Sequence, residues 1–287
     1  MKILVLQRFV LCLVFALSPL PLAAAVIEEV IEVPVSVKTI YNQSVTQRIS
    51  VTVWRDNTRE KAPFLILNHG RPPTSAAVAA MGRQRYSANS AYFVRRGFVV
   101  LVPTRVGYGP NGGTDVEYSG GCAGKMYPPV YLAAAQQTLD VLDRAKYLPY
   151  VDVTRGVVIG QSFGGATAIT LASLNPSGVV AAINFAGGGG GNPETLPERP
   201  CRPDLLESMF RVYGRTARIP TLWVYSENDR YFGKTLPRKW FNAFTAAGGQ
   251  GMFLELPPHG SDGHSSFTAN PAAWQAAVEE FLRKVGF

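Results

Sequence analysis

Histidine and cysteine are scarce in this sequence, which has three of each among its 287 residues. It contains no His-Glu-x-x-His pattern, and so few histidines cannot form the usual clustered ligands of a catalytic zinc ion. We therefore expect neither a metal nor a cofactor. Charged residues are also few, at 17%, and the basic ones form no run. A net charge of +8 without a basic stripe or a binding motif argues against a nucleic-acid partner.

Long apolar runs are absent after the first residues of the chain. Lys2 and Arg8 precede a short apolar stretch that ends in two prolines and three alanines. The stretch is shorter than the ~20 apolar residues of a membrane span. This pattern is typical of a secretory signal peptide, residues 1–25. We expect an exported protein, periplasmic or secreted, with no stable membrane span after processing and with residues 26–287 as one domain.

Removal of the signal peptide leaves two cysteines, Cys122 and Cys201. Export places them in an oxidising compartment, where a disulfide bond can form and persist. We therefore predict a disulfide between them. The alternative is a pair of separate buried thiols.

Strand-like and helix-like segments alternate along the mature chain. Two segments alternate apolar and polar residues, as half-buried strands do: 30–39 and 45–55. Six short apolar runs suit strands that are covered on both faces: 64–68, 98–102, 157–159, 179–185, 221–225 and 252–256. The helical stretches between them are 83–96, 130–148, 164–174, 236–247 and 272–284. The alternation predicts a doubly wound α/β fold with a mostly parallel sheet and helices on both faces.

Two connections are longer than this fold requires, at residues 110–129 and 186–219. Loops of such length are usually functional. We call them the lid segments. Each contains one of the two mature cysteines, so we expect the disulfide to join them over the carboxyl edge of the sheet.

Residues 160–164 read Gly-Gln-Ser-Phe-Gly and match the G-x-S-x-G pattern of a nucleophilic serine. The pattern alone is weak evidence. Here, however, it follows an apolar run and precedes a helix-compatible stretch, which is the strand–turn–helix setting that the motif needs. We therefore predict that Ser162 is the nucleophile.

A nucleophilic serine needs a general base, because its free hydroxyl is a poor nucleophile near neutral pH. In this chain order the base follows the nucleophile and the acid, which excludes His69. His264 and His259 remain, in the loop after the last strand. We favour His264, because two prolines press His259 against the strand end.

The acid that orients the base should lie just after a strand between Ser162 and His264. Asp229 occupies the turn after the run 221–225 and is our prediction. Glu227 is the alternative.

The oxyanion of the tetrahedral intermediate needs two aimed N–H donors. We predict the backbone N–H groups of Phe163 and Arg71. The two prolines after Arg71 have no N–H, and His69 and Gly70 are expected to shape the turn before it.

Substrate contacts are predicted for Arg105, Tyr108 and Tyr127. Arg71, Arg85 and Arg105 can bind a substrate carboxylate in bidentate fashion. The alternative is that these arginines are solvated or bound to lid acids such as Asp115 and Glu117.

The chain resembles the α/β-hydrolase superfamily, and more narrowly its dienelactone hydrolase-like proteins. The resemblance covers most of the mature chain and rests on the motifs at 68–70, 103–109, 160–165, 225–233 and 257–267. It implies hydrolysis of carboxylic esters or lactones without a metal or organic cofactor. The enzymes that name the family use a cysteine nucleophile, whereas position 162 is serine, so their substrate is not carried over.

These observations predict an exported serine hydrolase that acts on a small-molecule ester. One alternative is a serine peptidase related to the prolyl oligopeptidases but without their propeller domain. The mature chain has no room for a propeller before residue 64. A non-catalytic binding protein on a hydrolase scaffold is the other.

Overall fold

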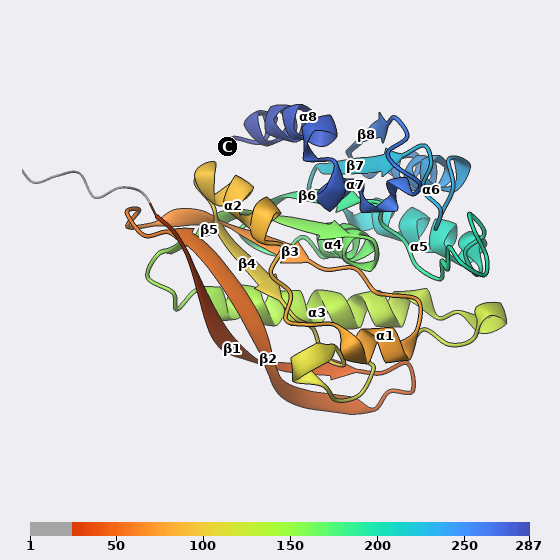
Figure 1. Ribbon diagram of the computed structural model, residues 1–287, viewed down its shortest axis with the longest axis horizontal. Helices are drawn as coiled ribbons and strands as arrows, with labels where there is room; N and C mark the ends of the chain where they lie inside the picture. The colour runs from red at the N-terminus through yellow and green to blue at the C-terminus, as the bar shows by residue number, and fades with distance from the viewer. Residues whose placement is uncertain (1–24) are drawn as a thin grey trace, which may run out of the picture.

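The computed structural model describes residues 25–287, so the predicted signal peptide lies outside the described residues except for Ala25. Eight strands form one sheet in the order β1-β2-β4-β3-β5-β6-β7-β8 (Figure 1). From β4 to β8 the strands run parallel, while β1 and β2 are antiparallel to their neighbours. The strands are β1 (Val26–Lys38), β2 (Ser44–Asp56), β3 (Ala62–Asn68), β4 (Val99–Pro103), β5 (Val151–Gln161), β6 (Val179–Phe185), β7 (Thr221–Ser226) and β8 (Gly251–Leu256).

Helices cover both faces of the sheet. They are α1 (Ser75–Ala80), α2 (Ser87–Arg95), α3 (Tyr127–Ala145), α4 (Phe163–Leu174), α5 (Pro203–Thr216), α6 (Thr235–Ala246), α7 (Ser266–Ala269) and α8 (Pro271–Lys284), with short 3-10 turns η1 (Gly109–Asn111), η2 (Cys122–Gly124) and η3 (Gly263–Ser265). Neighbouring strand residues point to opposite faces. Leu65 packs into the cluster under α2 and α8, whereas Ile66 packs into the one under α3 and α4. The continuous apolar runs therefore follow from burial on both sides, and the predicted α/β fold is confirmed.

The structure differs from the expectation mainly in the second lid segment and around α2. Residues 186–219 were expected to be loop, but α5 occupies their second half and packs against α6. Pro203 is the first residue of α5, where its missing N–H breaks no helical hydrogen bond. The short α1 was not predicted, and α2 begins at Ser87, four residues later than expected.

The loops that follow the parallel strands meet at the carboxyl edge of the sheet. The turns after β3, β5 and β7 lie there because those strands are parallel and paired in register. This edge is where doubly wound sheets hold their ligands. Within residues 25–287, no helix combines the length and the apolar character needed to cross a membrane.

Candidate active site

Ser162 lies in a strained turn between β5 and α4. Its backbone has φ +55° and ψ −120°, a conformation that a residue with a side chain rarely adopts. The flanking glycines make the turn possible. A Cβ on Gly160 would lie 1.9 Å from the carbonyl oxygen of Gly164, and one on Gly164 would lie 2.1 Å from that of Asn68. The elbow is therefore fixed by backbone packing, with Ser162 near the sheet edge.

Asp229 and His264 come together beside this elbow. The Oδ2 atom of Asp229 lies 2.9 Å from Nδ1 of His264, and the carboxylate is fully buried. Its Oδ1 atom accepts the backbone N–H groups of Tyr231 at 2.8 Å and Phe232 at 3.1 Å. These bonds fix the carboxylate, and the carboxylate fixes the imidazole through Nδ1. The other ring nitrogen of His264, Nε2, takes no part in this contact.

The position of His264 relative to Ser162 is set by two aromatic residues and one glutamine. Tyr231 stacks on the His264 ring with a 4.0 Å centroid separation, Phe232 meets it edge-on at 5.3 Å, and both line the same cavity as Ser162. Gln161 donates to the backbone carbonyl of His264 at 3.4 Å. Within residues 25–287, Ser162 Oγ makes no hydrogen bond to an imidazole. In enzymes without substrate this contact is often long and tightens only in the reacting complex.

The alternative residues occupy other roles. Glu227 pairs with Lys234 at 3.2 Å. His259 is held through its backbone by Asn228, as a turn residue would be. The predictions of Asp229 over Glu227 and of His264 over His259 agree with this arrangement.

The two predicted oxyanion donors both border the cavity that contains Ser162. Phe163 begins α4, and the first N–H groups of a helix have no partner within it. Arg71 follows Gly70 in the turn after β3. The Gly70–Arg71 peptide is trans, so its carbonyl and N–H groups point in opposite directions.

His69 fixes the orientation of that peptide. Its Nδ1 lies 2.7 Å from the Gly70 carbonyl oxygen, and its Nε2 lies 3.2 Å from the backbone nitrogen of Arg105. A carbonyl can only accept and an N–H can only donate, so Nδ1 carries the proton and Nε2 is bare. Burial lowers the pKa of His69 well below its usual value, and the charges of Arg105 and Arg71 act in the same direction. His69 is therefore a neutral support of the turn.

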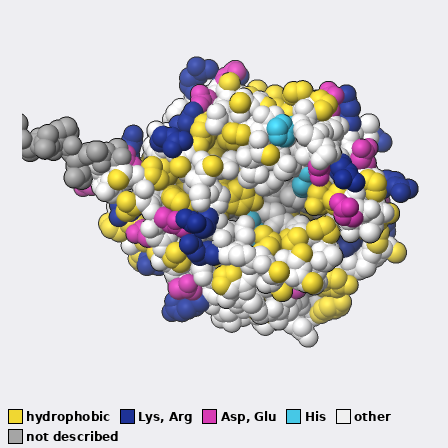
Figure 2. Space-filling model, viewed as in Figure 1, with side chains coloured by type: hydrophobic (Ala, Val, Ile, Leu, Met, Phe, Trp, Pro, Cys, Tyr) yellow, Lys and Arg dark blue, Asp and Glu magenta, His cyan; other side chains and the backbone are white. Residues whose placement is uncertain are grey.

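The cavity at the sheet edge has a volume of about 280 Å³. Its walls combine the serine elbow with both lid segments, including the Cys122–Cys201 disulfide, Tyr127 and the glycine run 188–191. The predicted disulfide is confirmed, with 5.0 Å between the two Cα atoms. Tyr127 donates to the carbonyl oxygen of Gly189 at 3.2 Å and to that of Cys201, so its hydroxyl joins the two segments. Figure 2 shows the hollow on this face, with hydrophobic side chains around it.

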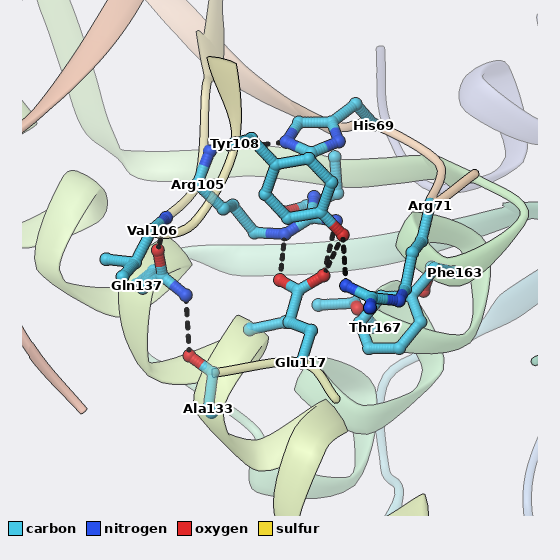
Figure 3. Close-up of polar contacts among 12 residues, drawn as sticks. His69, Arg71, Arg105, Val106, Tyr108, Glu117, Ala133, Gln137, Phe163 and Thr167 are labelled. Atoms are coloured by element: carbon cyan, nitrogen blue, oxygen red, sulfur yellow. Dashed lines mark hydrogen bonds and ion pairs between the residues drawn. The ribbon is translucent and has the colours of Figure 1, made fainter. Parts of the chain in front are cut away.

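The predicted substrate contacts of Arg105 and Tyr108 are wrong in their placement. Both side chains are fully buried and lie behind the cavity wall. Arg105 forms an ion pair with Glu117, which also accepts the Tyr108 hydroxyl (Figure 3). Arg71 lines the cavity, but its guanidinium is bound to Asp115 at 2.7 Å. The alternative that the arginines pair with Asp115 and Glu117 is the one the structure shows, because burial of a guanidinium requires a counter-charge.

Arg85, the third arginine predicted to bind a substrate carboxylate, pairs with Glu28 and does not line the cavity. In the described part of the chain, no three or more His, Cys, Asp or Glu side chains are grouped to hold a metal ion. Gln161, Tyr231 and Phe232 were not predicted as supports of His264. Their positions beside Ser162 and Asp229 in the chain were the available signal.

The model of the dienelactone hydrolase family matches residues 79–250, more than half of the chain. The chain belongs to the dienelactone hydrolase family. No curated protein is a match for it. As a member of this family it is a hydrolase, and its sheet and helices form the α/β-hydrolase fold.

Solved structures share this fold at low sequence identity. A Klebsiella pneumoniae protein assigned as a dienelactone hydrolase is 15% identical, with a TM-score of 0.54 over 90% of this chain and 97% of its own. A Bacteroides ovatus protein assigned as a dipeptidyl aminopeptidase IV is 15% identical, with a TM-score of 0.60 over 91% of this chain. The acylaminoacyl peptidase of Pyrococcus horikoshii is 12% identical, with a TM-score of 0.57 over 88% of this chain. This dienelactone hydrolase family member spans only 35% and 41% of those two peptidases.

Proposed function

We propose that the protein is an exported serine hydrolase that cleaves a carboxylic ester or lactone through an acyl-enzyme. The observation that carries the proposal is the Asp229–His264 pair at 2.9 Å, which lies beside the strained elbow whose Ser162 lines the cavity. The Cys122–Cys201 bond supports export, because disulfides persist mainly in oxidising compartments.

In the proposed mechanism, Nε2 of His264 takes the proton of Ser162 as Oγ attacks the substrate carbonyl. Asp229 holds the imidazole in the tautomer that can accept this proton and stabilises the imidazolium. The carbonyl oxygen becomes an oxyanion that accepts hydrogen bonds from the backbone N–H groups of Phe163 and Arg71. The imidazolium then protonates the leaving alcohol, and the ester bond breaks.

The second half of the reaction uses the same groups in reverse. His264 removes a proton from water, and the hydroxide attacks the acyl carbon held on Ser162. When the second tetrahedral intermediate collapses, its bond to Oγ breaks, the His264 imidazolium returns the proton to Oγ, and the carboxylic acid is released. Every proton that leaves a protein group is returned, so the cycle needs no cofactor.

Labelling with a fluorophosphonate probe tests the nucleophile directly. We expect the wild type to be labelled and Ser162→Ala to be unlabelled and inactive on p-nitrophenyl esters. Ser119→Ala is the matched control, because Ser119 also lines the cavity but lies outside the elbow. Labelling that persists in Ser162→Ala would contradict the proposal, and no labelling of the wild type would favour a non-catalytic binding protein.

The same enzyme preparation separates ester from peptide hydrolysis. The structural likeness to two peptidases shows a shared fold, and a peptidase is the second candidate function. Parallel assays with p-nitrophenyl esters and the corresponding aminoacyl p-nitroanilides decide between them. A higher kcat/KM for the anilides would replace the esterase with the peptidase.

A further inference from the structure

The lid segment 110–129 contains one fully buried acid, Glu117, which lies behind the cavity wall. Its carboxylate contacts the guanidinium of Arg105, which is also fully buried, and the hydroxyl of Tyr108. Although burial opposes its charge, Glu117 and Tyr108 raise the pKa of Arg105, so the guanidinium stays charged. Burial raises the pKa of Tyr108, which keeps its hydroxyl protonated as a donor. Glu117 therefore binds two residues of the loop that follows β4.

The first connection runs from Glu117 to the carbonyl side of the Gly70–Arg71 peptide. Arg105 binds Glu117 through its side chain and donates its backbone N–H to Nε2 of His69. The protonated Nδ1 of His69 then binds the Gly70 carbonyl oxygen. A carbonyl that is held on this side directs the N–H of the same trans peptide to the other side.

The second connection runs from Glu117 to the side chain of the residue that carries this N–H. The Tyr108 hydroxyl binds Glu117 and lies 3.5 Å from Nη1 of Arg71. Asp115, two residues before Glu117 in the same lid segment, binds the guanidinium of Arg71 at 2.7 Å. Figure 3 shows Arg71, Arg105, Tyr108 and Glu117 gathered below His69.

The first connection ends on the Gly70 carbonyl and the second on the Arg71 side chain, so the two flank one peptide group, and Arg71 borders the cavity containing Ser162. We propose that Glu117 is a positioning residue of the oxyanion hole, which keeps the Arg71 N–H aimed at the cavity while the lid segment 110–129 is docked. This inference rests on the proposed function, because an oxyanion hole matters only if Ser162 attacks a carbonyl. Glu117 itself contacts neither the cavity nor the substrate.

Glu117→Gln tests the proposal, since it keeps the shape of the side chain and removes its charge. A misaimed donor lowers the stabilisation of the transition state more than that of the bound ester. Loss of one oxyanion donor lowers kcat by ~10²–10³-fold, so a misaimed one should lower kcat by ~10–100-fold with KM within ~3-fold. A boronic acid inhibitor, which forms a tetrahedral adduct on serine, should bind more weakly by a similar factor. Glu28→Gln is the matched control, because it removes another carboxylate that pairs with two arginines, and we expect its kcat to equal that of the wild type.

Tyr108→Phe is the second variant, and it decides the matter should Glu117→Gln fail to fold. It removes one hydroxyl and no charge. We expect ~3–10-fold lower kcat with unchanged KM, because the hydrogen bond from the Arg71 N–H to the oxyanion becomes weaker. A kcat of both folded variants equal to that of Glu28→Gln, or a higher KM with unchanged kcat and boronate affinity, would overturn the proposal. Ser162→Ala separates this outcome from failure of the proposed function. If that variant stays active, the serine mechanism is wrong, whereas an inactive Ser162→Ala beside fully active Glu117 and Tyr108 variants refutes only the role of Glu117.

Discussion

The two walls of the cavity are built by different means. On the sheet side, the serine elbow is fixed by backbone contacts that leave no room for a Cβ at Gly160 or Gly164. On the lid side, a Cβ on Gly121 or Gly124 would meet open space, and the glycine run 188–191 packs mainly against aromatic side chains. There the chain is held by a disulfide and by the side chains of Asp115, Glu117 and Tyr127.

This difference assigns different consequences to substitutions on the two sides. A change in the sheet-side wall moves the reacting groups or prevents the elbow from forming. Changes in the lid-side wall remove individual ties and alter the shape of the cavity. We therefore expect kcat to depend on the sheet-side wall, and substrate range and stability to depend mostly on the lid-side wall. Glu117 is the exception, because it is a lid residue that we expect to affect kcat.

The largest expected effect is on the sheet side, at the general base. His264→Ala removes the group that takes the Ser162 proton, and we expect kcat to fall by roughly four to six orders of magnitude. His259→Ala, in the same loop, is the control and should retain at least half of the wild-type kcat. The measurement is the initial rate on a p-nitrophenyl ester. A large loss with His259→Ala and none with His264→Ala would reverse our assignment of the base.

Glycine substitutions compare the two walls directly. Gly160→Ala places a Cβ 1.9 Å from a backbone oxygen, so we expect it to lose ~3–5 kcal/mol of unfolding free energy or to fail to fold. Gly121→Ala meets nothing within 4 Å and should stay within ~0.5 kcal/mol of the wild type. Urea denaturation of both variants checks this. Equal stabilities would show that the elbow can relax and that the contrast between the walls is wrong.

The sheet-side wall could be predicted from the sequence because its determinants are local. The run of apolar residues before Ser162, the glycines around it and the helix after it lie within a few positions of one another. Asp229 and His264 follow from the rule that polar residues after parallel strands meet at one edge. Most strands were predicted to within four residues at each end, but β5 begins at Val151, six residues before its predicted run, because its first part is partly exposed.

The lid-side wall was predicted less well because its partners depend on the path of a long loop. Nothing in the spacing of Arg105 and Glu117 shows that both are fully buried, and an arginine near a predicted cavity resembles a substrate ligand. Helix α5 was missed because the glycine run before it dominates the composition of residues 186–219. Pro203 at its first position was a usable signal.

The disulfide should matter for stability and for the shape of the cavity. The double variant Cys122→Ser/Cys201→Ser releases a loop of 79 residues, and we expect a loss of ~2–5 kcal/mol of unfolding free energy. Since both cysteines line the cavity, KM for bulky esters should change while kcat for a small acetate ester is retained. Thermal melting and assays on an ester series measure the two effects. A loss of kcat on every ester alike would place the disulfide among the supports of the sheet-side wall.

The smallest expected effect concerns the buried neutral His69. Its pKa is lowered in the folded protein, so the unfolded chain binds a proton at acid pH that the folded chain does not. Stability is therefore fully present above the unfolded pKa of ~6.5 and is lost as pH falls below it, by up to ~1.4 kcal/mol per pH unit. His69→Asn keeps a donor near the Nδ1 position but cannot titrate. The difference in unfolding free energy between wild type and His69→Asn should thus shrink from pH 7 to pH 5 in urea melts, whereas a constant difference would mean that His69 is protonated in the fold and that the Gly70 peptide is held in another way.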